Sequence, residues 1–584
     1  MFRRPRPPRA RSRWDTQSPP RAAVLGVART LTSATRVLDV MELLRVEDGI
    51  EKYYTVNPGS AFADGLHEYL VSVAGPRVLT WAEATRRTFQ LAVACAVHPT
   101  MRRLDAPLMV MPHGAGYNRL VSESTGDATS PAGLSRRELT HRGKVIPAAI
   151  GVSHPDQLAR LLDTCPEAVP RAEVIGDWCA QRIRDSEARR DWYRARFGVT
   201  DGRRLVVLHS TWSAHSLLGR HPGLPLDLVT ALPADEYAVA AVFHPNVWAR
   251  HTRADLLERL REPMDAGLMV IPPEEGWRAA IVACDAVIGD HGSTTFYSAA
   301  HDRPTLLATA GLAELDPVSP AAAFAATAPR LDPSGDLHAQ LLRAQREYDP
   351  GVLRPVVDSQ LADVEKSGER TQRRLYAFLE HRGVPLPRQL PGPSPVPEPS
   401  PERGAPTLAY VVTGAVLPDG SVGVRRLPMV PGRVGAGFAG AAGSGSAEEG
   451  GGFYAVAAEC AHPTWSQSAD VIARTVPVVD PSPADWCLRE APRRLGAAVL
   501  AARIDDFSAV VRLRDTLFEA HTERPWGGLR PTLDPLLLGA ALNLWLTDGH
   551  SGAELVRGLV IRTGPGSVRV AFTRAATSLA LDGV

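Results

Sequence analysis

The chain has 584 residues, of which 44% are hydrophobic and 22% are charged, and its formal net charge is +1. This length exceeds what one hydrophobic core supports, so we expect about two to four domains. The near-neutral charge argues against nucleic acid as a partner, because nucleic-acid-binding proteins carry a basic field. Six cysteines lie far apart without a CxxC pair, which indicates reduced thiols in a cytoplasmic protein.

The N-terminus is rich in arginine and proline, and residues 1–20 are expected to form a disordered tail. No apolar run approaches the roughly 18 residues that span a membrane, and the apolar segment behind the arginines is interrupted by Arg29. We therefore expect no signal peptide and at most a peripheral association with anionic lipid.

Strands and helices alternate from Arg21 onward. Ala22–Val27 has the apolar pattern of a strand, and helix-like and strand-like segments follow it in turn. The alternation restarts at Arg204–Leu208 and ends in a long amphipathic helix predicted over Asp358–His381. Such alternation predicts an α/β protein with parallel, doubly wound sheets. Two Rossmann-like domains are therefore predicted, over 21–190 and 191–382.

A proline-rich segment comes next, with nine prolines in the 22 positions from 385 to 406. This composition favours polyproline II, so 383–406 is predicted to be a semi-stiff linker. Residues 407–584 are predicted to be an accessory α+β module that binds a protein partner. Its predicted elements are hairpins at Tyr410–Leu427 and Leu555–Phe572, and helices near Ala491–Arg503, Phe507–Ala520 and Pro535–Leu546.

The most informative joint lies within Ala279–Ala308. A strand-like run ends at Asp290, Gly292-Ser293-Thr294 follows, and an apolar helix begins. The unpaired amides at such a helix start lie beside the positive end of the helix dipole, which suits a phosphate or pyrophosphate. Ser and Thr also cap ordinary helices, so an ordinary strand–helix joint is the alternative.

Two further strand ends carry histidines. His113-Gly114 follows the apolar run Leu108–Met111, and His244 follows Tyr237–Phe243. Ligands of doubly wound sheets bind outside the carboxyl ends of the strands, where these side chains are expected. Imidazole acts as a general base near neutral pH, and neighbouring glycines allow a substrate to approach closely. In each case a structural turn is the alternative.

Other motifs narrow the function. Glu274 and Glu275 precede a helix, where they either accept hydrogen bonds from a ribose or simply favour the helix dipole. The chain lacks GxxxxGK[ST], which argues against a P-loop nucleotidase. It also lacks HExxH, and Cys460-Ala461-His462 has no second pair of ligands, so we expect no metal and no cofactor.

Taken together, these joints resemble the two-domain GT-B fold, and within it the bacterial CDP-glycerol glycerophosphotransferases, the teichoic-acid polymerase family. That family carries a His-Gly after a strand in its first half, a His-Pro after a strand in its second half, and a Ser/Asp-rich strand–helix joint. The resemblance covers roughly 21–382 and implies that His113 is the catalytic base. It places the donor pyrophosphate at His244, Ser293 and Thr294, with Asp290 at the acidic position of the same joint. We therefore expect these four residues to bind the donor phosphates. Further candidates, for contacts with the donor ribose or the acceptor, are Glu274, Glu275, Gly114 and Arg119.

The chain also departs from that family. Several basic residues usually follow the His-Gly, whereas Arg119 is the one basic residue here, and the Ser-Asp-Tyr-Ser-Ser joint is replaced by Gly289–Thr294. A glycosyltransferase using a nucleotide sugar, or a nucleotide-sugar 2-epimerase, would use much the same scaffold. We expect a cytoplasmic transferase that moves a glycerophosphate or glycosyl group from a nucleotide-diphosphate donor to an unknown acceptor hydroxyl. The alternative is a non-catalytic GT-B-like scaffold that recruits a partner through 407–584.

Overall fold

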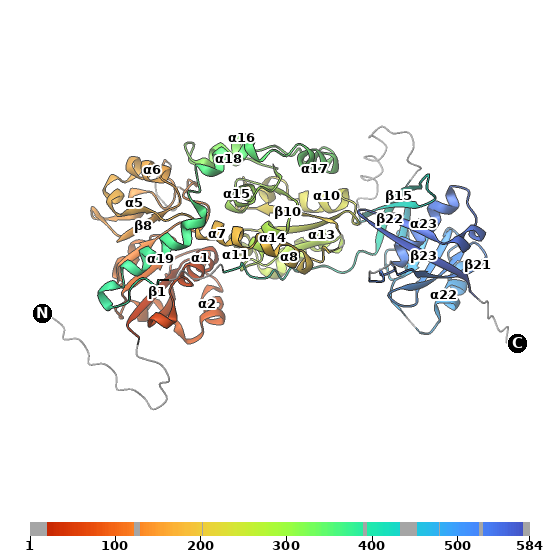
Figure 1. Ribbon diagram of the computed structural model, residues 1–584, viewed down its shortest axis with the longest axis horizontal. Coiled ribbons are helices and arrows are strands. Elements are labelled where there is room, and N and C mark those ends of the chain that lie inside the picture. Colours follow the sequence, from red (N-terminus) through yellow and green to blue (C-terminus); the bar gives the residue numbers. More distant parts are fainter. Residues whose placement is uncertain are drawn as a thin grey trace, which may run out of the picture.

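The computed structural model describes residues 20–121, 129–200, 202–388, 394–431, 452–477, 479–524 and 529–575. They form three bodies in a row: two with parallel sheets and one closed barrel (Figure 1). Residues 1–19, which include the arginine-rich tail expected to be disordered, lie outside the described ranges. Within those ranges, none of the helices combines the length and the apolar character needed to cross a bilayer.

The first body contains a seven-stranded sheet in the order β3-β2-β1-β4-β5-β8-β9, with parallel pairing throughout. The strand order reverses between β1 and β4. Its strands are β1 (Ala22–Ala28), β2 (Ile50–Val56), β3 (Val78–Leu79), β4 (Leu91–Ala94), β5 (Leu108–Val110), β8 (Ala149–Val152) and β9 (Ala172–Val174), beside a hairpin of β6 (Thr140–His141) and β7 (Lys144–Val145). Its helices are α1 (Leu31–Met41), α2 (Leu66–Ala74), α3 (Trp81–Ala84), α5 (Arg136–Leu139), α6 (Asp156–Thr164) and α7 (Trp178–Asp185).

The second body contains a five-stranded parallel sheet in the order β12-β11-β10-β13-β14. Its strands are β10 (Arg204–Ser210), β11 (Tyr237–Phe243), β12 (Leu268–Ile271), β13 (Ala286–Gly289) and β14 (Thr305–Leu307). Its helices are α8 (Arg190–Arg196), α9 (Leu217–Arg220), α10 (Leu224–Ala231), α11 (Pro245–Arg250), α12 (Arg253–Arg259), α13 (Arg261–Asp265), α14 (Trp277–Ala283), α15 (Ser293–Ala300), α16 (Pro320–Thr327), α17 (Leu337–Arg346) and α18 (Pro350–Asp358). The two Rossmann-like parallel sheets predicted from the alternation are therefore present.

The long helix predicted over Asp358–His381 is wrong. α18 ends at Asp358, an irregular crossing follows, and α19 (Ser367–Ala377) begins nine residues later. Asp363 in the crossing has φ 42°, a left-handed conformation that an α-helix does not accept. The break lets the chain return to the first body, where Leu375 and Tyr376 pack into the core that contains β1.

The proline-rich segment does not extend freely where it is described. Val396 is buried in the core of the second body, and its amide donates to the Ser186 hydroxyl. Glu402 pairs through its backbone with Val270 at the edge strand β12. Arg182 donates to the carbonyls of Ser394 and Pro395. Polyproline geometry leaves backbone groups unpaired, so this segment gains partners by lying along the second body.

The third body is a closed barrel in the order β15-β16-β22-β23-β21-β20-β19-β18-β17. Its strands are β15 (Ala409–Val416), β16 (Val422–Pro428), β17 (Phe453–Ala457), β18 (Val471–Arg474), β19 (Val499–Arg503), β20 (Ser508–Leu513), β21 (Thr516–Thr522), β22 (Leu559–Thr563) and β23 (Gly566–Arg574), and its helices are α21 (Pro463–Ser468), α22 (Pro483–Glu490) and α23 (Pro535–Thr547). The apolar helix α23 packs into the main hydrophobic core of the barrel. Both predicted hairpins and the Pro535–Leu546 helix are present.

The helices predicted over Ala491–Arg503 and Phe507–Ala520 are wrong, because this part of the chain forms the antiparallel strands β19, β20 and β21. Turns at Asp505-Asp506 and Arg514-Asp515 divide the apolar sequence into strand-length pieces. Arg514 has φ 51°, which a helix does not accept. Short apolar runs rich in alanine and valine fit either element, and the turns decide between them.

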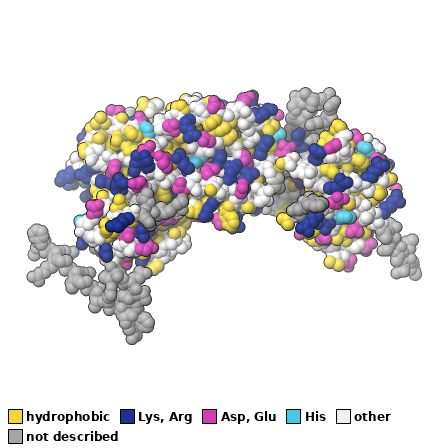
Figure 2. Space-filling model, in the orientation of Figure 1, with side chains coloured by type: hydrophobic (Ala, Val, Ile, Leu, Met, Phe, Trp, Pro, Cys, Tyr) yellow, Lys and Arg dark blue, Asp and Glu magenta, His cyan; other side chains and the backbone are white. Residues whose placement is uncertain are grey.

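The barrel contacts the second body through Arg426 on β16. Its buried guanidinium donates to Asp235 in the second body at 2.7 and 2.9 Å, and it also pairs with Asp534 beside α23. Burial lowers the pKa of Arg426, but the two carboxylates outweigh it, so the pKa lies well above the usual value. On the face shown in Figure 2, cationic and acidic side chains are interspersed over all three bodies, in keeping with the net charge of +1.

Candidate active site between the two parallel sheets

The second sheet places its two central joints side by side. Strand order reverses between β10 and β13, and the segments that leave their carboxyl ends are Thr211–Ser216 and Asp290–Gly292. Such a reversal is where ligands of doubly wound sheets bind, because the following helices diverge to opposite faces. Loops from the first body meet this point, as described below.

Asp290 organises both joints. Its Oδ2 accepts from the amides of Thr211 at 2.8 Å and Leu217 at 2.9 Å, and its Oδ1 accepts from the Gly292 amide at 3.0 Å. The carboxyl is fully buried, and this burial raises its pKa. Both oxygens are thus occupied by backbone amides, which differs from the direct phosphate contact expected from the sequence. A carboxylate also repels phosphate, so Asp290 shapes the joint instead.

The start of α15 is open. Gly292 is its N-cap residue, and no side chain caps this end of the helix. A Cβ at Gly289 would lie 2.3 Å from Thr295 Oγ1, so glycine is what allows the helix to approach its strand this closely. The first amides, at Ser293, Thr294 and Thr295, therefore face outward with the positive end of the helix dipole. Ser293 is exposed and Thr294 is half-buried.

The loop after β5 brings His113 to this point. Gly114 touches α15: a Cβ there would lie 2.5 Å from Ser293 Oγ. Gly116 has φ 72°, and a Cβ there would lie 1.7 Å from Gln360 Nε2 in the crossing between α18 and α19. Both glycines are thus required by close approach, one to the second body and one to the chain that returns from it.

His113 presents an exposed side chain, although protein from both bodies surrounds the ring. Burial, together with Arg36 and Arg119, lowers its pKa to about 4, and the Cys95 backbone opposes this shift. The imidazole is therefore uncharged near neutral pH. In an uncharged imidazole one nitrogen carries the proton and the other is an acceptor. That is the protonation state a general base needs.

His244 lies within electrostatic range of His113. Burial, together with the electrostatic effects of His113 and Arg119, lowers its pKa to about 3. Its Nδ1 accepts from the Asn246 amide at 3.1 Å, so the side chain caps α11 and its other nitrogen carries the proton. His113, His244 and Ser293 are thus brought together from three segments far apart in the sequence.

Arg119 connects the two bodies. It donates to Glu314 Oε2 at 2.7 Å and to the Trp212 carbonyl at 2.8 Å, and its guanidinium lies 4.5 Å from the Trp212 ring centroid. Glu314 also pairs with His291 Nε2 at 2.9 Å. Arg119 therefore reaches the site, but these contacts already engage its charge.

The two predicted glutamates differ. Glu275 forms an ion pair with the buried Arg278, which also pairs with Asp39 in the first body. Glu275 therefore belongs to an ion network between the bodies, and its contact with a ribose stays a prediction. Glu274 is half-buried beside it, and the charges of both act on Tyr69 in α2.

Two site residues, Arg36 and Trp212, were not singled out by the motif analysis. Arg36 on α1 is buried. It donates to the Tyr297 hydroxyl at 2.9 Å and to the His113 carbonyl at 3.4 Å, so it joins the loop that carries His113 to α15. Trp212 lies with its ring centroid 6.3 Å from that of His244 and 5.4 Å from that of Phe62. The position of Trp212 just after β10 was the available signal, because that strand borders the reversal of the sheet.

No family model matches the chain, and no relative among curated proteins matches it. The chain is similar to the wall teichoic acid polymerase TagF. That structure is 11% identical, with 62% of this chain and 89% of that chain covered and a TM-score of 0.41. The chain is also similar to MnaA from S. aureus in a co-structure with UDP. The identity is 11%, with 64% of this chain and 100% of that chain covered and a TM-score of 0.37. A glycosyltransferase from Rickettsia africae is 12% identical over 62% and 98%, with a TM-score of 0.34.

Among the described residues, no group of three or more His, Cys, Asp or Glu side chains is placed to hold a metal ion. The groups that the site offers include the amides, hydroxyls and imidazoles named above. An uncharged base, an imidazole N–H and an open helix start together suit transfer from an anionic, phosphate-bearing donor.

Proposed function

We propose that the protein is a GT-B-type transferase that moves a glycerophosphate or glycosyl group from a nucleotide-diphosphate donor to an acceptor hydroxyl. The observation that carries this proposal is the convergence of His113, His244 and the open start of α15 between two parallel sheets. Residues that bind substrates in doubly wound folds occupy these strand ends. The resemblance of the same joints to the teichoic-acid polymerase family points in the same direction.

In this proposal the donor phosphates bind at the start of α15. The amides of Ser293 and Thr294 donate to phosphate oxygens, and the hydroxyls of both residues are within reach of the same group. The His244 nitrogen that carries the proton donates to a phosphate oxygen as charge develops on the leaving nucleotide. Donors fixed in advance stabilise that charge more than water does.

His113 accepts the proton of the acceptor hydroxyl while that oxygen attacks phosphorus or an anomeric carbon. The negative charge of a bound diphosphate opposes the effect of Arg36 and Arg119, so it raises the pKa of His113 from about 4 toward neutrality. His113 thus becomes a stronger base when the donor is bound, so it accepts the proton of the acceptor hydroxyl more readily in the donor complex.

A His113→Gln variant tests the assignment of the base. We expect turnover to fall by about 10²–10⁴, the usual contribution of general-base catalysis, with nucleoside-diphosphate affinity unchanged within about threefold. Turnover is measured as nucleotide release and affinity by titration calorimetry. The matched control is His67→Gln, an exposed histidine on α2, which should keep full turnover. Unchanged turnover in His113→Gln contradicts the proposal.

A thermal-shift panel of CDP-glycerol and of UDP-, GDP- and CMP-linked donors identifies the donor. A ligand at 100 times its Kd stabilises the folded state by about 2.7 kcal/mol, so the correct donor gives a shift of several degrees. The shift should be lost in a His244→Ala/Ser293→Ala variant. No shift with any donor, together with capture of a protein partner by 407–584, would favour the non-catalytic scaffold.

A further inference from the structure

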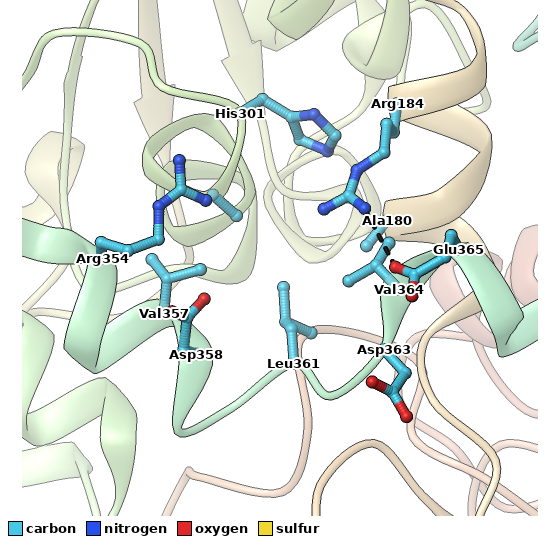
Figure 3. Close-up of a pocket in the computed structure, with 11 residues that line it drawn as sticks. Ala180, Arg184, His301, Arg354, Val357, Asp358, Leu361, Asp363, Val364 and Glu365 are labelled. Atoms are coloured by element: carbon cyan, nitrogen blue, oxygen red, sulfur yellow. Dashed lines mark hydrogen bonds and ion pairs between the residues drawn. The ribbon is translucent and has the colours of Figure 1, made fainter.

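A second polar cavity lies away from the candidate active site. It has a volume of about 200 Å³ and lies where the chain passes between the two Rossmann-like bodies. Its walls come from α7, from the end of α15, from α18 and from residues 361–365 of the crossing that leads to α19 (Figure 3). This is many times the roughly 10–15 Å³ that one water molecule needs on the same measure.

His301 forms one wall of this cavity. Its side chain is 5% exposed, and its Nε2 atom is buried without a hydrogen-bond partner among the described residues. A buried imidazole nitrogen without a partner is costly, and a ligand oxygen is one group that can satisfy it. In Figure 3 the ring lies between the side chains of Arg354 and Arg184.

The two arginines retain free donors. Arg184 donates to Glu365 through Nη1, and Arg354 donates to both oxygens of Asp302 through Nη2. A guanidinium has five N–H groups, so each arginine keeps others that these contacts do not use. The planar fork of donors suits a tetrahedral oxyanion.

Three arginines act on the His301 ring, and one carboxylate oxygen, Glu187 Oε1, lies 3.9 Å from its Nδ1. Burial, together with the charges of Arg303, Arg184 and Arg354, lowers the pKa of His301 to about 3, and the Ala180 backbone opposes this shift. Among the acidic side chains of the wall, Glu365 pairs with Arg184, and Asp363 pairs with Arg370 outside the cavity. Asp358 forms no ion pair with the described residues and lies on the side opposite His301 (Figure 3).

We propose that this cavity is a binding site for a small oxyanion of the phosphate class, held by His301, Arg184 and Arg354. The site is separate from the proposed donor site and does not depend on the proposed transferase function. Inorganic phosphate and the phosphate group of a small monoester share this chemistry, and the volume accommodates either.

An anion here would act on the junction of the two bodies. Arg184 belongs to α7, which precedes the second body, whereas His301 directly follows α15 and Arg354 belongs to α18 within that body. Leu361 lines the cavity, and the adjacent Gln360 packs against Gly116 in the loop that carries His113. Binding of an anion in this cavity would therefore order the crossing between α18 and α19, which packs against the loop that carries His113.

Titration calorimetry of the full chain with inorganic phosphate, ribose 5-phosphate and sulfate, at constant ionic strength, tests the site. We expect binding of at least one of the two phosphates, and at least a tenfold loss of affinity in both His301→Asn and Arg354→Gln. Arg343→Gln, an exposed arginine on α17, is the matched control and should bind normally. Tighter binding of ribose 5-phosphate than of inorganic phosphate would identify the monoester as the preferred form.

Two further variants separate this site from its alternatives. His244→Ala/Ser293→Ala should retain this binding, which excludes the start of α15 as its location. Asp358→Asn removes a like charge, so it should tighten phosphate binding by about two- to fivefold; weaker binding would show that the cavity favours a cation. Failure of all three anions to bind at 10 mM, or full binding in His301→Asn and Arg354→Gln, overturns the proposal.

Hydrogen exchange gives an independent readout. Saturating phosphate should slow exchange of the amides in residues 359–366, and the effect should disappear in Arg354→Gln. Slowing confined to the start of α15 would place the anion in the other site and contradict the inference.

Discussion

At the scale of single residues, buried histidines set how the protein responds to acid. His209 at the end of β10 is fully buried, and its ring nitrogens make no hydrogen bond of normal geometry to the described residues. Burial lowers its pKa to about 3, with the nearby Thr294 backbone opposing the shift. The unfolded chain, with a histidine pKa of about 6.5, therefore binds more protons than the folded protein between these two values.

The stability that depends on uncharged His209 is thus present above pH 6.5 and is lost as the pH falls toward 3. A His209→Gln variant removes this titration. We expect the difference in unfolding free energy between the parent and the variant to fall by about 2 kcal/mol from pH 7.5 to pH 5. Urea unfolding at both pH values measures it, and parallel pH profiles for the two proteins would contradict the assignment.

At the scale of elements, Gly116 in the loop after β5 can be compared with Gly143 in the turn between β6 and β7. Gly116 and Gly143 both have φ 72°, but a Cβ at Gly116 would collide with Gln360, whereas nothing lies within 4 Å of a Cβ at Gly143. Gly143 is thus a matched control for the backbone strain alone. The difference between the two positions reports the packing of the crossing against the loop of His113.

Gly143→Ala should destabilise the protein by about 1 kcal/mol, the cost of a left-handed alanine. Gly116→Ala should cost about 1–3 kcal/mol more, because Gln360 and the loop must separate. The expected consequence is a displaced His113 and a loss of turnover in Gly116→Ala alone. Equal unfolding free energies for the two variants would show that the collision is relieved without cost.

At the scale of the whole molecule, buried ion pairs join the two Rossmann-like bodies. Asp39 on α1 accepts from Arg182 on α7 and from Arg278 on α14, and all three side chains are buried. Arg160 on α6 similarly pairs with Asp316 in the second body at 2.5 Å. Loss of one partner in such a network leaves a charge buried without compensation, which is strongly destabilising.

Asp39→Asn should therefore weaken the junction by about 3–5 kcal/mol. Calorimetric unfolding is expected to separate into a lower and a higher transition as the bodies lose their coupling. Glu369→Gln, which removes an exposed i,i+4 pair with Arg373 on α19, is the control and should change stability by less than about 0.5 kcal/mol. A single transition at an unchanged temperature in Asp39→Asn would show that other contacts hold the junction.

The sequence by itself determined what depends on local pattern. Alternating strand-like and helix-like runs predicted both parallel sheets, because periodicity and turn residues are properties of neighbouring positions. The same pattern placed His113, His244 and Ser293 at strand ends, and parallel strands bring their carboxyl ends to one edge. The roles of these residues in catalysis and donor binding stay predictions.

Only the tertiary structure decided what depends on partners distant in sequence. The sequence pattern of β19 to β21 fits helices as well as strands, and pairing with neighbouring strands of the barrel decides for strands. Asp290, expected to face a phosphate, is turned inward by three backbone amides from two joints. Val396, within the proline-rich segment, is buried in the core of the second body, and α19 packs into the core of the first body. In each case burial and hydrogen bonding with residues far along the chain outweigh the local preference, and a single sequence does not reveal those neighbours.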